Sequence, residues 1–95
     1  MSSSGPIIPS YTRVRMWVME YGAPGSDDKR GAIDFLEIEA NEAISSLRGE
    51  LASLAQGNYI EEIMDRLVGP ARKQRHGSYD EWARSMLRWM ANPKN

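Results

Sequence analysis

Apolar side chains recur at helical spacing along most of this chain, and the pattern predicts four helices. One apolar face stays in phase at 100° per residue across residues 33–55, which a strand does not do. It predicts one long helix over 30–55, in which Gly49 is interpreted as a point of close helix contact. The face is formed by nine residues: Ile33, Leu36, Ala40, Ala43, Ile44, Leu47, Leu51, Leu54 and Ala55.

Two further helices follow from their capping residues and stop signals. Asn58 opens a sequence similar to a capping box, and a Gly-Pro pair ends the helix predicted over 58–68. Ser78 opens an S-x-x-E capping box, which predicts the last helix over 79–91. The residues between them, 70–77, are predicted to be a connection rich in basic side chains.

The first apolar segment, residues 11–21, fits two patterns. A helical face predicts the first of the four helices, whereas alternation of apolar and polar residues also fits a strand. A strand here needs a partner, so the alternative fold is α+β, with an N-terminal hairpin of strands 12–20 and 32–39 followed by three helices. Phe35 and Ile38 lie off the apolar face of the long helix, which favours this alternative.

Length and composition favour one domain. The chain has 95 residues, of which 41% are hydrophobic and 26% charged, as in globular proteins. Residues 1–10 are small, polar or bounded by proline and are predicted to be a flexible arm. We therefore predict a small all-α domain of four helices over residues 11–95. No apolar run is long enough for a membrane span or an export signal, so we expect a cytoplasmic protein.

Charge is divided along the chain although the net charge is only −1. The acidic region, residues 27–65, carries ten acidic and three basic side chains, and the basic region, residues 66–95, carries seven basic and two acidic ones. Either the two regions attract each other within one monomer, or the acidic region docks on the basic region of a second copy. The candidate residues for binding an anion or a nucleic acid are Arg72, Lys73, Arg75, Arg84 and Arg88.

Catalytic and cofactor chemistry finds little support in the sequence. The absence of cysteine excludes disulfides and thiolate zinc sites, and the chain has no glycine-rich phosphate loop and no E-x-x-H pair. His76 lies in the predicted connection without an evident catalytic companion. We predict no enzyme activity, no cofactor and no metal, while an oxygen-only metal site shared between copies stays open.

Aromatic and methionine side chains favour a protein-binding function. Three Trp, four Tyr and six Met are many for so small a core, and these residue types are enriched at interfaces. We predict a non-enzymatic protein-binding or assembly module, with a homo-oligomer as one form, and a nucleic acid or acidic partner bound by the basic region as the alternative. The partner-binding candidates are Trp17, Trp82, Met86, Trp89 and Met90.

One short stretch also resembles a known family. Residues 78–90, SYDEWARSMLRWM, are similar to C-terminal helices of phage-type primase helicases. The resemblance covers 13 of the 95 residues and contains no catalytic motif, so it implies no function for this chain.

Overall fold

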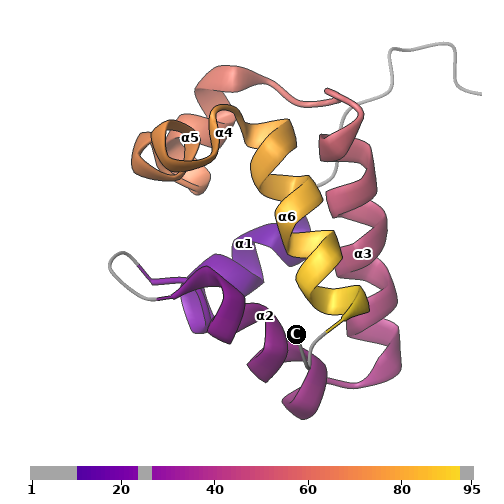
Figure 1. The fold of residues 1–95 in the computed structure, drawn as a ribbon. Coiled ribbons are helices and arrows are strands. Elements are labelled where there is room, and N and C mark those ends of the chain that lie inside the picture. Colours follow the sequence, from indigo (N-terminus) through magenta and orange to yellow (C-terminus); the bar gives the residue numbers. More distant parts are fainter. Residues whose placement is uncertain (1–10, 24–26, 93–95) are drawn as a thin grey trace, which may run out of the picture.

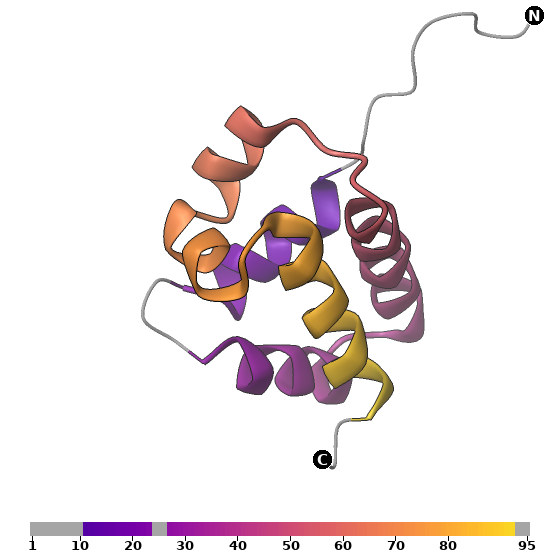
Figure 2. The same cartoon turned by 45° about the horizontal axis from the view of Figure 1, so that its top comes forward.

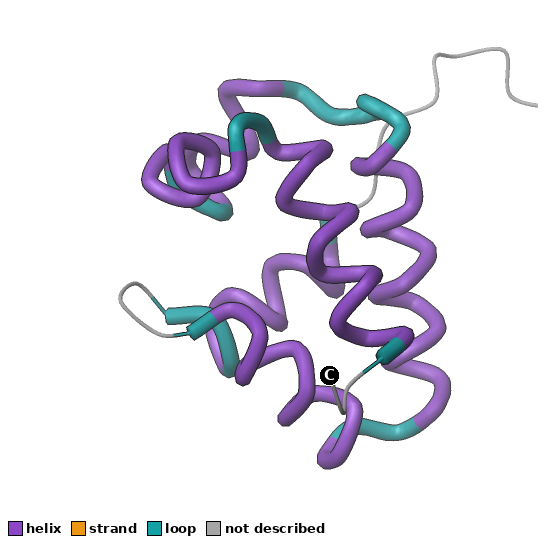
Figure 3. The backbone as a smooth tube through the Cα atoms, in the orientation of Figure 1, coloured by secondary structure: helices purple, strands orange, loops and turns teal. Residues whose placement is uncertain are grey.

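The structure, a computed structural model, describes residues 11–23 and 27–92, and within these ranges every regular element is a helix (Figures 1 and 3). The all-α prediction is confirmed, and the alternative hairpin of strands 12–20 and 32–39 is wrong because residues 12–20 and 32–38 are helical. The predicted arm at 1–10 lies outside the described residues. The helices are α1 (Thr12–Glu20), α2 (Asp28–Ile38), α3 (Asn41–Ala55), α4 (Glu61–Leu67), α5 (Pro70–His76) and α6 (Tyr79–Ala91).

The long helix predicted over 30–55 is in fact two helices, α2 and α3, which meet at a corner. Glu39 and Ala40 have extended backbones, with ψ angles of 155° and 157°. The change of direction lets Phe35, which lay off the continuous apolar face, enter the core. The hydroxyl of Tyr21 donates a hydrogen bond of 2.6 Å to the Glu39 carboxylate and ties the corner to the end of α1.

The segment between α3 and α6 also differs from the prediction. The helix expected over 58–68 starts later, at Glu61, and Asn58 does not cap it. The predicted connection at 70–77 contains a helix of its own, α5. Gly69 and Gly77 bound this helix with φ angles of 104° and 99°, a left-handed conformation that other residues adopt only with strain.

The core lies where α3 packs along α6, with α1 and α2 closing one side (Figures 1 and 2). The predicted capping box is present at the start of α6, where Ser78 Oγ accepts a 3.2 Å hydrogen bond from the Glu81 amide. The largest fully buried side chains are Trp17, Trp82, Tyr79, Phe35, Leu47, Leu51, Leu54, Met64, Met86, Met90 and Val14.

A carboxylate from another helix caps the start of α1. Glu50 of α3 accepts hydrogen bonds of 2.9 Å and 3.0 Å from the backbone amides of Arg13 and Val14. These amides would otherwise be among the unpaired donors at a helix start. The other end of a helix is held in the same manner, since Arg84 of α6 donates a 2.9 Å hydrogen bond to the carbonyl of Ala55, at the end of α3. The helix ends are therefore fixed by tertiary contacts.

The hydrogen bond from Tyr21 to Glu39 makes the stability of the fold sensitive to alkaline pH. This bond, followed by burial, raises the pKa of Tyr21 to about 12 from its ordinary value of 10.0. The unfolded chain loses the phenolic proton near pH 10, about two pH units before the folded chain does. The stabilisation is therefore complete below pH 10 and disappears as the pH rises to about 12.

Absorbance titration of tyrosinate in the wild type and in Tyr21→Phe tests this pH dependence. We expect the difference between the two titrations, which isolates Tyr21, to have a midpoint near pH 12. Denaturant unfolding of the wild type should show stability falling above pH 10, and the fall should be smaller in Tyr21→Phe. A difference midpoint near pH 10 would contradict the assignment.

Candidate partner-binding groove

Most of the aromatic and methionine residues predicted to bind a partner lie in the core. Trp17, Trp82 and Met86 have no exposed surface, and Met90 is 2% exposed. This corrects the sequence-based assignment, because side chains so deeply buried reach a partner only if the core opens. Trp89 differs from the other four in being half-buried at the surface of α6.

Arg72, predicted to bind an anion, forms a buried ion pair instead. Its guanidinium donates hydrogen bonds of 3.0–3.1 Å to the carboxylate of Asp28, which also accepts a 3.1 Å bond from Trp82 Nε1. The same guanidinium donates to the carbonyl of Gly22 and lies over the Trp17 ring, 5.5 Å from its centroid. Arg72 therefore holds α5 to α2 and α1, and at 4% exposure it offers almost no surface to a ligand.

Ion pairs within the monomer join the acidic and basic regions, as the first interpretation of the charge pattern expects. In addition to the Asp28–Arg72 pair, Lys73 Nζ lies 2.5 Å from the Glu61 carboxylate and 3.7 Å from that of Asp65. All three pairs connect a carboxylate of the acidic region with a cation of the basic region. These pairs involve three of the ten carboxylates and two of the seven cations, so a part of the charge division is satisfied inside one chain.

The three remaining predicted cations differ in whether an acidic partner neutralises them. Arg84 pairs with Asp80 at 3.4 Å and with Glu81 at 2.9 Å, both on its own helix. Arg75 and Arg88 are exposed, on α5 and α6 respectively. The structure therefore leaves two of the five cations without an ion pair among the described residues, on different helices.

His76 packs against a neighbouring helix and is not fully exposed to solvent. It is the last residue of α5, not a loop residue, and its half-buried ring lies edge-on to Trp89 with 6.1 Å between the ring centroids. Burial lowers the pKa of His76 below its ordinary value of 6.5, so the imidazole is neutral near pH 7. The His76 ring therefore forms part of the contact between α5 and α6.

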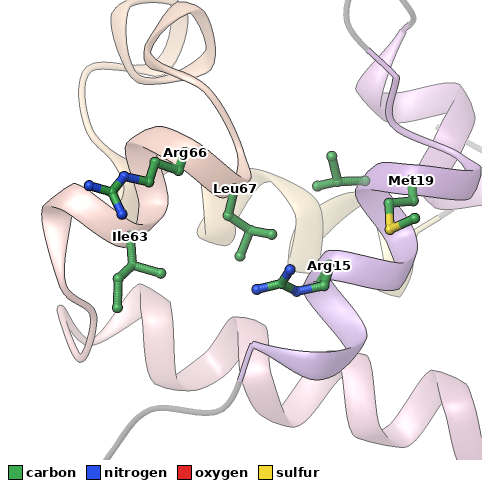
Figure 4. A pocket seen from close by; sticks show the side chains of 6 residues that line it. Arg15, Met19, Ile63, Arg66 and Leu67 are labelled. Atoms are coloured by element: carbon green, nitrogen blue, oxygen red, sulfur yellow. The ribbon is translucent and has the colours of Figure 1, made fainter.

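A groove of about 500 Å³ lies between α1 and α4 (Figure 4). In the figure, the side chains of Ile63 and Leu67 from α4 face those of Arg15 and Met19 from α1. Met19 is the most exposed large hydrophobic residue of the described chain, at 76%. The binding groove is lined by Arg15, Val18, Met19, Ile63, Arg66 and Leu67.

The two arginines of the binding groove are available to a ligand. Arg15 and Arg66 are exposed, and neither forms an ion pair within residues 11–23 and 27–92. Arg15 reaches from α1 toward α4, whereas Arg66 lines the groove from α4 with its guanidinium extended away from Arg15 (Figure 4). The groove therefore offers two positive groups beside aliphatic side chains.

Sequence reasoning missed the binding groove for a physical reason. Arg15 and Met19 are spaced i, i+4 on the side of α1 opposite its buried face. A single apolar residue on that side, Met19, is only a weak indication of a binding surface. The opposite wall comes from α4, more than forty residues later in the chain. Nothing in the local pattern of either helix indicates that the two lie together.

Other classes of site receive no support from the described residues. Within them, no group of three or more His, Cys, Asp or Glu side chains is placed to hold a metal ion. No described helix combines the length and the apolar character that crossing a bilayer requires. A functional assignment rests on the geometry of the groove, since no protein-family model, no curated protein and no solved structure matches this chain.

Proposed function

We propose that this chain is a non-enzymatic protein-binding module whose binding groove holds an acidic, amphipathic helix of a partner protein. One observation carries the proposal: the groove combines an aliphatic lining with Arg15 and Arg66, two arginines without an ion pair in the described part of the chain. The absence of enzyme activity stays a prediction, and the packing of His76 against Trp89 is consistent with it.

The apolar part of the groove suits the hydrophobic face of a helix. Val18 and Met19 on one wall, with Ile63 and Leu67 on the other, form a surface that can receive side chains from successive helical turns. Met19 adds adaptability, because its unbranched side chain can take several shapes against a partner. Covering Met19, which is 76% exposed, removes apolar surface from water and favours binding.

The charged part of the groove selects the partner. A guanidinium matches the planar geometry of a carboxylate and can bind it through two parallel hydrogen bonds. Arg15 and Arg66 stand beside apolar side chains, which lower the local dielectric constant and strengthen such a pair once the groove is covered. A helix bearing Lys or Arg at the same places would be repelled, so the arginines also exclude basic partners.

Fluorescence anisotropy with a synthetic peptide tests the proposal. The probe is an amphipathic helix of about four turns with leucines along one face and glutamates on either side of it. We expect the wild type to bind it and the double variant Arg15→Glu, Arg66→Glu to bind at least about tenfold more weakly, because two attractive contacts become repulsive.

A matched control separates the groove from general charge. The double variant Arg75→Glu, Arg88→Glu changes the net charge by the same amount at exposed positions outside the groove. It should bind the acidic peptide within about twofold of the wild type at physiological salt, because distant exposed charges are screened. Failure of the wild type to bind, or equal binding of a peptide with lysine in place of glutamate, would make the proposal wrong.

A further inference from the structure

The corner between α2 and α3 carries an exposed apolar side chain with acidic residues beside it. Ile38, the last residue of α2, is 69% exposed, and Glu37 and Glu42 next to the corner are exposed as well. Neither carboxylate forms an ion pair within the described ranges. We call Glu37, Ile38 and Glu42 the acidic corner.

The acidic corner and the binding groove are complementary in charge and in polarity. The corner offers one large aliphatic side chain and two carboxylates, and the groove offers an aliphatic lining and two guanidinium groups. From this match we infer that a second copy of this chain inserts its acidic corner into the binding groove. The inference rests on the proposed function, because it names this chain itself as a source of the acidic helical segment.

The contacts follow from the chemistry of the two surfaces. Ile38 of one copy lies on the aliphatic lining of the other copy's groove. Glu37 and Glu42 of the first copy pair with Arg15 and Arg66 of the second. Burial of an apolar side chain then occurs together with neutralisation of four charges, each otherwise exposed.

The placement of the two surfaces makes the association head-to-tail. The α4 wall of the groove lies at the opposite end of the molecule from the α2–α3 corner in both views of the ribbon (Figures 1 and 2). A chain therefore cannot fill its own groove. Each contact leaves one groove and one corner open, so copies add in series until a ring closes or a filament grows.

The contact is weak because the area is small. Six residues line the groove, far fewer than the roughly 20–30 residues that each partner contributes to a stable interface. Association is therefore expected to depend on concentration and to decrease as salt screens the four charges.

Sedimentation velocity of the full chain tests the inference. At low salt we expect the mean mass of the wild type to rise with concentration past that of a dimer, and to fall back at about 0.5 M salt. The groove variant, Arg15→Glu with Arg66→Glu, and the corner variant, Glu37→Gln with Ile38→Ser, should each remain monomeric. Compared with the wild type at physiological salt, where distant exposed charges are screened, the control variant Arg75→Glu, Arg88→Glu should associate to the same extent.

Mixing the groove variant with the corner variant is the most specific test of the inference. The groove variant keeps an intact corner and the corner variant keeps an intact groove, so an equimolar mixture should form a dimer and stop there. Restored association in the mixture also shows that both variants are folded, which removes misfolding as an explanation for their monomeric state.

The outcomes distinguish this inference from the proposed function. If the wild type and the mixture both remain monomeric while the acidic peptide still binds the groove, the inference is wrong and the proposed function stands. If neither the peptide nor a second copy binds, both are wrong. A wild-type dimer that persists in the groove variant and in the corner variant would place self-association on another surface and would also overturn the inference.

Discussion

Replacing Asp28 with leucine is expected to reduce the free energy of unfolding by about 3–5 kcal/mol, because Arg72 remains buried without its counter-charge. Asp28 is 3% exposed and Arg72 is 4% exposed, so water does not replace the lost carboxylate. Trp82 Nε1 also loses its acceptor on Asp28. Domains are stable by only about 5–15 kcal/mol, so this one change removes a large part of the total.

A paired replacement separates the buried charge from the lost packing. In the double variant Asp28→Leu, Arg72→Met, no unpaired charge remains in the core, so most of the lost stability should return. The exposed control is Lys73→Ala, which removes the ion pairs to Glu61 and Asp65 and should cost no more than about 1 kcal/mol. Urea unfolding gives all three values, and a loss below about 1 kcal/mol in Asp28→Leu would show that the pair is not structural.

The buried ion pair also explains why sequence reasoning missed α5. Its sequence, PARKQRH, has no apolar face, and at seven residues it is too short to be stable by itself. Tertiary contacts hold it in place, chiefly those of Arg72 with Asp28 and with the carbonyl of Gly22. A local bond from Arg72 to the carbonyl of Val68, four residues earlier, adds to them. A charged residue that is buried cannot be distinguished from an exposed one by periodicity.

The last helix was predictable because its local signals agree with one another. Ser78 caps α6 as predicted, and most of the helix's apolar face is buried, including Trp82, Met86 and Met90, while Trp89 is half-buried. The break between α2 and α3 was not predictable in the same way. The apolar positions of the two helices happen to remain in phase, so the sign of a corner was that Phe35 and Ile38 lie off the combined face.

The sequence pattern also could not locate the candidate site. An aromatic and methionine face is equally typical of a core and of an interface, and here four of the five partner-binding candidates lie in the core. The groove depends on how α1 lies against α4, which follows from the packing of both against the rest of the fold. Residue types alone led to the prediction of a partner surface, which stays a prediction, and could not indicate where on the fold it would lie.

Two glycine-to-alanine substitutions are expected to have opposite effects on stability. A Cβ atom at Gly31 would lie 2.6 Å from the backbone carbonyl oxygen of Tyr21 and 3.1 Å from the Trp17 ring. Neither neighbour can move without shifting α1 or the core, so Gly31→Ala should cost about 1–3 kcal/mol through overpacking. At Gly49 a Cβ atom would meet nothing within 4 Å, which corrects the interpretation of Gly49 as a close helix contact.

Gly49→Ala should instead stabilise the fold by about 0.5–1 kcal/mol, because alanine restricts the unfolded chain and favours the helix. Both positions lie inside helices, Gly31 in α2 and Gly49 in α3, so intrinsic helix propensity predicts the same gain for both. The opposite sign at Gly31 therefore measures the packing of α2 against α1. We expect the urea midpoint to fall in Gly31→Ala and to rise in Gly49→Ala. If both midpoints rise, α1 and α2 do not approach each other closely at Gly31.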